Sequence, residues 1–208
     1  MWVVKLGGSL IGAPALIGWL DALTQFGDGK VVIVPGGGIF ADAVCDAQAK
    51  TGIDDATAHQ LAVVAMDQYA TLMTGLNTDL VMASSELEIA ECGRQHRAVV
   101  WKPSAMVLAD KDLPKDWDLT SDSLAAWLAA KLNAEHLLVV KSISPSYVEK
   151  IDVESLMIDN VVDSYFGKYF TGMSFKTWLV SKNEFININQ PITHQSRPAM
   201  GVEIVVGS

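Results

Sequence analysis

The stretch Val3-Val4-Lys5-Leu6-Gly7-Gly8-Ser9 decides the fold class of this chain. Its apolar residues predict a short buried strand, and the two glycines end that strand in a turn. An amphipathic run over residues 13–25 follows the turn and predicts a helix. A strand, a glycine turn and a helix in this order are typical of an α/β protein.

The same pattern returns along the chain. Residues 30–34 predict a second strand, Gly36-Gly37-Gly38 a turn, and residues 40–50 a helix. Further helices are expected over 54–76, 124–132, 153–166 and about 174–181, and further strands over 99–101, 135–140, 185–188 and 202–206, while 79–85 fit neither type. The alternation predicts an α/β fold, a three-layer αβα sandwich with a mostly parallel central sheet, and ligands at the carboxyl ends of the strands.

Composition limits the function classes. Half of the 208 residues are apolar and 19% are charged, which favours one well-packed domain over residues 1–208 and excludes disorder. The net charge of -9 opposes non-specific binding to nucleic acid or to an anionic membrane. The spacing of Cys45 and Cys92 fits neither a disulfide framework nor a zinc site, and no apolar stretch is long enough to span a membrane. We therefore expect a soluble cytoplasmic protein.

Both glycine turns are candidate phosphate sites. Glycines after a strand let backbone N–H groups approach an anion, and the start of the next helix adds partial positive charge. Taken singly, Gly7-Gly8 or Gly36-Gly37-Gly38 is better explained as an ordinary tight turn, whereas the two together favour phosphate binding. Neither the P-loop spacing nor the dinucleotide-binding spacing is present, so these common nucleotide motifs do not explain the turns.

Lys5 is the second candidate feature. A lysine inside an apolar strand is costly to bury unless its ammonium group emerges at the strand end onto a ligand, and a phosphate would be such a ligand. A lysine that reaches solvent from an edge strand is the alternative. The four histidines show no metal-ligand spacing, so the sequence predicts no protein-held metal.

Four segments in order resemble the amino acid kinase family, also called the aspartate, glutamate and uridylate kinase family. They are Val-Val-Lys-Leu-Gly-Gly-Ser at 3–9, Val-Val-Ile-Val-Pro-Gly-Gly-Gly at 31–38, Thr-Ser-Asp-Ser-Leu-Ala-Ala at 120–126 and, more loosely, Thr-Gly-Met-Ser-Phe-Lys at 171–176. The resemblance covers nearly the whole chain. It implies a kinase that uses ATP with Mg²⁺.

The resemblance also implies roles for single residues. Lys5 and Lys176 would neutralise the transferred phosphoryl group, and Asp122 would orient both ammonium groups. On its own, Asp122 could simply cap a helix. The other implied contacts are Gly7, Gly8, Ser9, Lys141 and Ser142 for the nucleotide, and Gly36, Gly37 and Gly38 for the acceptor. Residues 1–135 would be mainly the acceptor side and 136–208 mainly the nucleotide side.

One loop departs from the family pattern. After the strand at 135–140, members often carry a Thr-Asp-x-Asp-Gly-Val loop, whereas this chain has Lys-Ser-Ile-Ser-Pro-Ser at 141–146. This difference keeps open a non-catalytic sensor or storage protein that binds a nucleotide or an oxyanion.

The short length and the segment Ala-Met-Asp-Gln-Tyr-Ala at 65–70 resemble a small branch of the family. Its best-known activity adds a second phosphate to a phosphorylated aminomethylfuran alcohol, a methanofuran precursor. Asp67 and Tyr69 are candidates to bind the aminomethyl group, although a helical aspartate is more often only solvated. Isopentenyl phosphate, UMP and an acylated amino acid are alternative acceptors. The resemblance and the apolar, tryptophan-rich composition also suggest a homo-oligomer.

Overall fold

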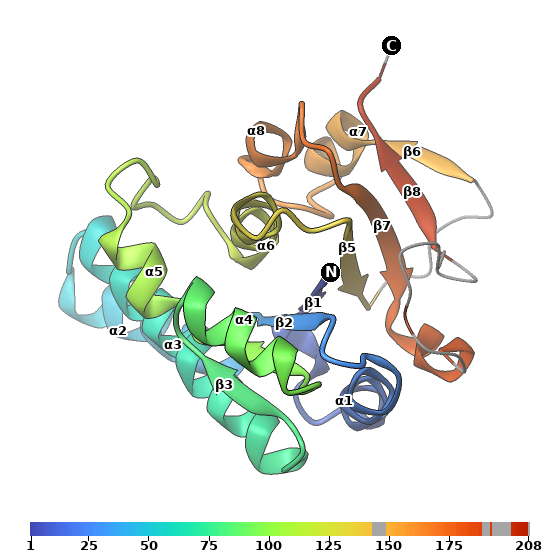
Figure 1. Ribbon diagram of the computed structural model, residues 1–208. Coiled ribbons are helices and arrows are strands. Elements are labelled where there is room, and N and C mark those ends of the chain that lie inside the picture. The colour runs from blue at the N-terminus through green and yellow to red at the C-terminus, as the bar shows by residue number, and fades with distance from the viewer. Residues whose placement is uncertain (143–148, 189–191, 193–200, 208) are drawn as a thin grey trace.

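The computed structural model describes residues 1–142, 149–188, 192 and 201–207. Within these residues the strands form one eight-stranded sheet in the order β3-β4-β2-β1-β5-β7-β8-β6 (Figure 1). The strand bounds are β1 Trp2–Leu6, β2 Val31–Pro35, β3 Val81–Ala83, β4 Val99–Trp101, β5 His136–Lys141, β6 Lys150–Asp152, β7 Lys176–Ser181 and β8 Val202–Val205.

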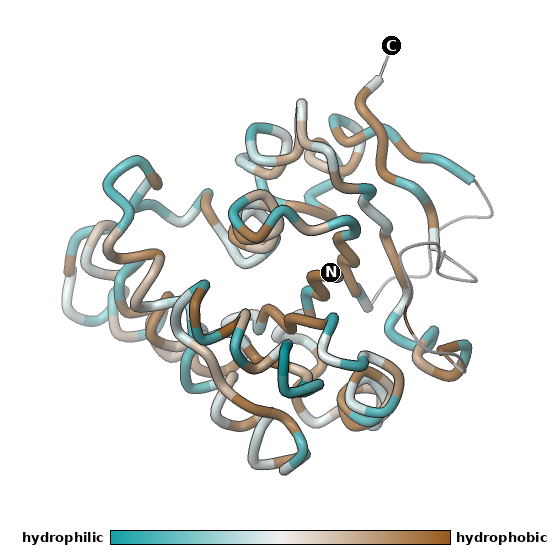
Figure 2. Tube along the Cα trace, in the orientation of Figure 1, coloured by the Kyte–Doolittle hydropathy of each residue, from teal (hydrophilic) through white to brown (hydrophobic). Residues whose placement is uncertain are grey.

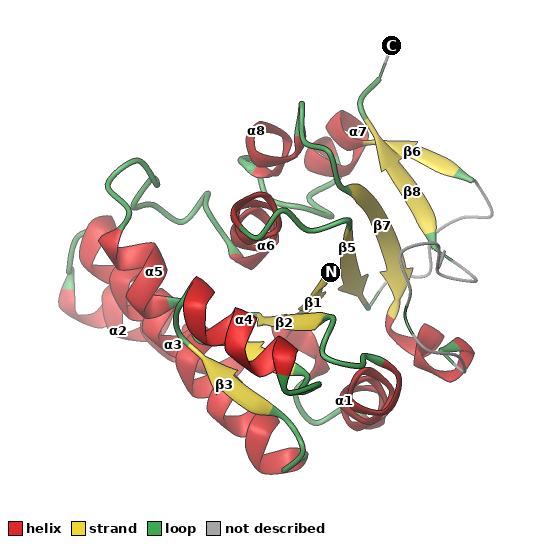
Figure 3. Cartoon of the chain, viewed as in Figure 1, coloured by secondary structure: helices red, strands yellow, loops and turns green. Residues whose placement is uncertain are grey.

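Helices cover both faces of this sheet (Figure 3). The α-helices are α1 Pro14–Phe26, α2 Gly38–Thr51, α3 Asp55–Leu76, α4 Glu86–Arg94, α5 Ser104–Ala109, α6 Ser121–Lys131, α7 Val153–Ile158 and α8 Phe166–Phe170. Among the described residues, the 3₁₀ helix η1 Gly8–Leu10 follows β1 after Gly7, and the 3₁₀ helix η2 Lys182–Asn187 follows β7 directly. The predicted three-layer α/β fold is confirmed.

Strand β1 lies between β2 and β5 and is parallel to both. The register places Lys5 opposite Val34 on one side and Val139 on the other. The remaining pairs are parallel too, except that β8 runs antiparallel to β7. Because β1, β2 and β5 are parallel, their carboxyl ends meet at one edge of the sheet, where both glycine turns begin.

Successive side chains of β1 enter two different cores, one on each face of the sheet. Val4 packs in the cluster that contains Leu16 and Leu20 of α1. Val3 packs in the cluster that contains Leu124 of α6. In Figure 2 the central strands are mostly brown (hydrophobic), whereas the helices around them carry both brown and teal residues. Since Lys5 has the same parity as Val3, its side chain leaves the sheet on the face that α6 covers.

Three of the elements expected in the last third of the chain were wrong. Residues 176–181, expected as a helix, form strand β7, and residues 185–188, expected as a strand, lie mostly in η2. A short run that is buried on both sides has no alternation to reveal its period, which explains the error at β7. The helix expected over 153–166 ends at Ile158, and Asn160 adopts a left-handed φ of 53° before α8 begins.

The structure also assigns the stretch that the sequence left open. Residues 79–85 contain β3, after which Ser85 caps α4 by accepting a hydrogen bond from the Glu88 N–H. Among the described helices, none combines the length and the apolar character needed to cross a membrane.

Candidate active site

The two glycine turns are packed backbone against backbone. The Gly36 N–H donates a hydrogen bond of 2.9 Å to the Leu6 carbonyl, which ties the second turn to the end of β1. A Cβ atom at Gly8 would lie 2.2 Å from the Gly38 nitrogen, and one at Gly36 would lie 2.5 Å from the Gly8 nitrogen. The close approach of these two backbone segments therefore requires glycine at both positions, independently of any ligand.

Gly7 is different, because no backbone crowds it. A Cβ there would lie 3.6 Å from Lys5 Nζ and 3.6 Å from Ser9 Oγ, at ordinary contact distances. The missing side chain leaves space in front of an ammonium group and a hydroxyl group, both of which bind phosphate oxygens. At the neighbouring turn, Gly37 has no side chain with which to cap the first N–H groups of α2. Both turns can thus present donors to an anion.

A buried charge cluster lies on the α6 face of β1. Lys5 Nζ is 2.8 Å from Asp122 Oδ1, and Lys141 Nζ donates a hydrogen bond of 2.6 Å to Asp122 Oδ2. The side chains of Lys5 and Asp122 are only 6% and 5% exposed, and that of Lys141 is 19% exposed. Two ammonium groups share one carboxylate, so the cluster carries an excess positive charge that an anion can balance.

The surroundings shift the pKa values within this cluster. Burial alone would raise the pKa of Asp122, but the ammonium groups of Lys5 and Lys141 outweigh burial and hold it below its ordinary value. Burial lowers the pKa of Lys141, and the Lys5 ammonium lowers it further, against the opposing effect of Asp122. Asp122 is therefore ionised near neutral pH and keeps both ammonium groups in place.

Asp122 is positioned by the start of α6. Thr120 is the N-cap residue, and its hydroxyl accepts a hydrogen bond of 3.4 Å from the Asp122 N–H. Asp163, from the loop between α7 and α8, accepts from the N–H groups of Thr120 and Ser123 at 3.1 and 3.0 Å. It also accepts from the Thr120 hydroxyl at 2.6 Å and from the Ser123 hydroxyl. Asp163 thus fixes the first turn of α6 and, with it, the Asp122 side chain.

Sequence reasoning missed Asp163. It stands 41 positions after Asp122 in the sequence (163 minus 122), in a segment expected to be helical, and no local motif marks it. The packing of α8 against α6 brings the two segments together.

The expected nucleotide contacts lie together at the carboxyl ends of β1 and β5. Ser9 Oγ is 3.0 Å from Ser142 Oγ, and Lys141 is the last residue of β5. Gly7 and Gly8 directly follow β1. The rest of the unusual loop, residues 143–146, falls outside the described part of the chain.

Lys176 does not join this cluster. It is the first residue of β7 and pairs with His136, the first residue of β5, whereas Lys141 pairs with Ser181 at the other end. Lys176 therefore lies at the amino ends of the strands, where its side chain is exposed. The expectation that Asp122 orients Lys5 and Lys176 needs correction, because the second ammonium group beside Asp122 belongs to Lys141.

Asp67 and Tyr69 are held by the protein itself. The Asp67 carboxylate accepts hydrogen bonds from the N–H and the hydroxyl of Ser104, at 3.2 and 2.5 Å, where α5 begins. Tyr69 is fully buried in the core on the α1 face, and its hydroxyl donates to the Gly7 carbonyl at 3.5 Å. Asp67 therefore holds the start of α5, and Tyr69 supports the first glycine turn. The expected contact of these two residues with an aminomethyl group stays a prediction.

Known proteins resemble this chain in sequence and in fold. The model of the amino acid kinase family matches residues 1–100. The (5-(aminomethyl)furan-3-yl)methyl phosphate kinase of Methanocaldococcus jannaschii is 26% identical over 149 residues, which are 71% of this chain and 68% of that protein.

Solved structures match over almost the entire length. Uridylate kinase from Archaeoglobus fulgidus superposes with a TM-score of 0.69 at 16% identity, over 98% of this chain and 99% of that one. UMP kinase from Ureaplasma parvum gives a TM-score of 0.67 at 12% identity, over 98% and 97%. At these identities the likeness concerns the fold. The family model thus covers the first 100 residues, and the whole chain shares the fold of these solved kinases.

Proposed function

We propose that this protein is a kinase of the amino acid kinase family, which uses ATP to convert a phosphorylated aminomethylfuran alcohol into its diphosphate, as a step of methanofuran-type cofactor synthesis. The acceptor named for the relative from Methanocaldococcus jannaschii supports this choice. Phosphoryl transfer itself rests on one observation, which is that Lys5 and Lys141 both contact buried Asp122, at 2.8 and 2.6 Å, beside the glycine turns.

The reaction asks the protein for alignment and for stabilisation of negative charge. An oxygen of the acceptor phosphate forms a bond to the γ-phosphorus of ATP, while the bond from that phosphorus to the β–γ bridging oxygen breaks and ADP leaves. In our proposal Lys5 and Lys141 balance the charge that moves between the two oxygens. Asp122 does not react with the phosphoryl group and holds the two ammonium groups at a fixed separation.

The residues present fit a phosphate chain. The cluster has two cations for one anion, and the space before Gly7 opens onto Lys5 Nζ and Ser9 Oγ. Ser142 would extend this contact on the nucleotide side. Mg²⁺ would bind through phosphate oxygens, because both oxygens of Asp122 are already committed to ammonium groups.

The second glycine turn suits the phosphate that the acceptor already carries. Gly36, Gly37 and Gly38 lead into α2, a helix of 14 residues, so a phosphate at the turn would meet the N–H groups of its first turn. We also propose a cytoplasmic location and a homo-oligomeric state, as expected from composition. Sedimentation analysis of the purified protein measures the latter.

An acceptor panel tests the proposal. Purified protein with ATP and Mg²⁺ is offered the aminomethylfuran monophosphate, isopentenyl phosphate, UMP or an acylated amino acid, and release of ADP is followed. We expect the highest kcat/KM with the aminomethylfuran monophosphate. Preferential turnover of another acceptor would refute the aminomethylfuran monophosphate as the acceptor and would still support kinase activity. ATP binding without turnover of any acceptor would favour a sensor.

A further inference from the structure

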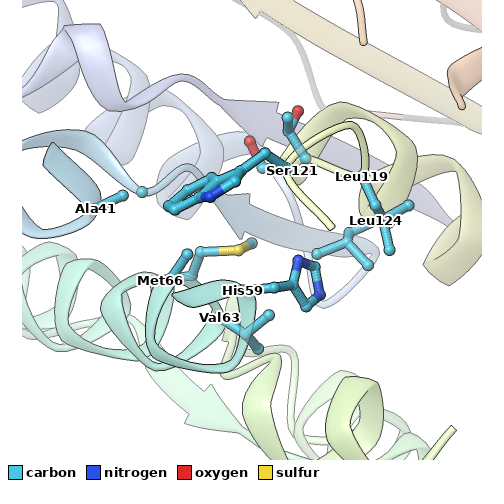
Figure 4. Close-up of a pocket in the computed structure, with 11 residues that line it drawn as sticks. Ala41, His59, Val63, Met66, Leu119, Ser121 and Leu124 are labelled. Atoms are coloured by element: carbon cyan, nitrogen blue, oxygen red, sulfur yellow. The ribbon is translucent and has the colours of Figure 1, made fainter. Parts of the chain in front are cut away.

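A pocket of about 140 Å³ opens next to the second glycine turn and has no role in the site described so far. Figure 4 shows its two walls: His59, Val63 and Met66 rise from α3, and Leu119 and Leu124 face them from the other side. Gly37 and Ser121 also line it. Since Ser121 directly precedes Asp122, the pocket adjoins the charge cluster along the chain.

The lining is apolar and partly aromatic. None of the described residues that line the pocket is Asp, Glu, Lys or Arg. The Trp117 indole is fixed by its Nε1–H, which donates 2.8 Å to Gln48 Oε1 on α2. Burial lowers the pKa of His59, against the opposing effect of a hydrogen bond with the Asp116 backbone, so its imidazole is neutral near pH 7. Such walls favour binding of an uncharged ligand group over a charged one.

The volume of the pocket also limits the size of the ligand group that can enter it. An apolar protein cavity of about 150 Å³ accommodates a single benzene ring. A flat ring would also find favourable partners in the Trp117 indole and the Met66 thioether. A nucleoside, by contrast, brings both a base and a ribose, and the hydroxyl groups of the ribose would lose water against apolar walls.

We propose that this pocket binds the ring of the acceptor, as one small neutral ring whose phosphate points to the Gly37 turn, and that it discriminates against nucleoside monophosphates. The inference rests on the proposed function for the identity of the ligand as an acceptor. It leaves the charged substituents of that acceptor at the mouth of the pocket. Ala62, on α3 between His59 and Val63 in the lining, sets the room available to the ring.

Calorimetric titration without ATP tests the pocket by itself. The probes are benzyl phosphate, inorganic phosphate and UMP. We expect benzyl phosphate to bind the wild-type protein about tenfold or more tightly than inorganic phosphate, because one ring leaves water. UMP should bind more weakly than benzyl phosphate. Tighter binding of UMP than of benzyl phosphate would overturn the proposal.

Two variants and a matched control locate the effect. Ala62→Leu fills the pocket and Trp117→Ala removes one wall, so each should raise the Kd of benzyl phosphate about tenfold and leave that of inorganic phosphate unchanged. Ala56→Leu makes the same change at an exposed position of α3 and should alter neither value. An unchanged Kd for benzyl phosphate in both pocket variants would refute the assignment.

The outcomes separate this inference from the kinase assignment. If no acceptor is phosphorylated but the ring effect is present, the proposed function fails and the pocket stands. If the aminomethylfuran monophosphate is phosphorylated with the same acceptor KM in Ala62→Leu as in wild type, the proposed function stands and the pocket assignment fails.

Discussion

Asp122 is a carboxylate that burial would neutralise if Lys5 and Lys141 did not surround it. In Asp122→Asn the amide cannot balance two ammonium groups, and their repulsion moves them apart. We expect kcat to fall by about a hundredfold or more, with a smaller change in the KM for ATP.

Steady-state kinetics with the best acceptor of the panel provide the measurement. The control is Asp42→Asn on the exposed surface of α2, which removes the same charge outside the cluster of Lys5, Asp122 and Lys141. A kcat within twofold of the wild-type value in Asp122→Asn would mean that the cluster does not serve catalysis, on the scale of about tenfold per 1.4 kcal/mol.

Lys141 and Lys176 form a matched pair, since each is a lysine at one end of a strand in the nucleotide half. Lys141→Ala removes a buried partner of Asp122 and should lower kcat by about a hundredfold. Lys176→Ala removes an exposed charge at the opposite edge of the sheet and should leave kcat nearly unchanged. The kcat values of both variants are measured in parallel. A large loss of kcat in Lys176→Ala with little change in Lys141→Ala would restore the role first expected for Lys176.

At the scale of elements, the first turn of α6 depends on a residue from outside that helix. The Asp163 carboxylate accepts hydrogen bonds from Thr120 and Ser123 through both of its oxygens. In Asp163→Asn the amide nitrogen can only donate, so at least one of these donors loses its acceptor. We expect the free energy of unfolding to fall by about 2 kcal/mol and kcat to fall with it.

Urea denaturation gives the stability change, and kinetics at 25 °C, where the variant remains folded, give the change in rate. Asp159→Asn, at the C-terminal end of α7, is the control for loss of one surface carboxylate. Equal stability of Asp163→Asn and wild type would show that the hydrogen bonds seen at α6 contribute nothing measurable.

The contact between the two glycine turns is a second element-scale feature. In Gly8→Ala the new methyl group would lie 2.2 Å from the Gly38 nitrogen, so the two turns must separate. We expect a loss of unfolding free energy of about 2 kcal/mol or more and a large loss of activity. Gly75→Ala is the control: no atom lies within 4 Å of its added Cβ, and helix α3 should gain up to about 1 kcal/mol.

Thermal or urea denaturation measures the free energy of unfolding of both variants, which should fall in Gly8→Ala and rise in Gly75→Ala. Similar stability changes in the two variants would contradict the interlocked arrangement of the turns.

How far the sequence could predict the elements depended on whether their signals are local. Strand β1 and helix α1 were predictable because glycines and a clear apolar period lie within a few residues of one another. Strand β7 was not, because a strand covered on both faces shows no alternation. The same limit applies to the site: Lys5 and Asp122 lie in recognisable motifs, whereas the choice of Lys141 over Lys176 depends on strand order and register.

At the scale of the whole molecule, a chain of net charge -9 keeps an excess of positive charge at one buried point. The sheet makes this possible because the parallel strands β1, β2 and β5 bring Lys5, both glycine turns and Lys141 to one edge. The overall field opposes anions, so binding must come from the site itself. A kinase for a small phosphorylated acceptor fits this distribution of charge.

³¹P NMR can follow every phosphorus atom while the protein acts on ATP, Mg²⁺ and the aminomethylfuran monophosphate. We expect the acceptor's monoester signal to be replaced by the paired signals of a diphosphate ester, in step with ADP formation. Formation of ADP with only inorganic phosphate, or transfer to a group other than the acceptor phosphate, would refute the proposed monophosphate kinase.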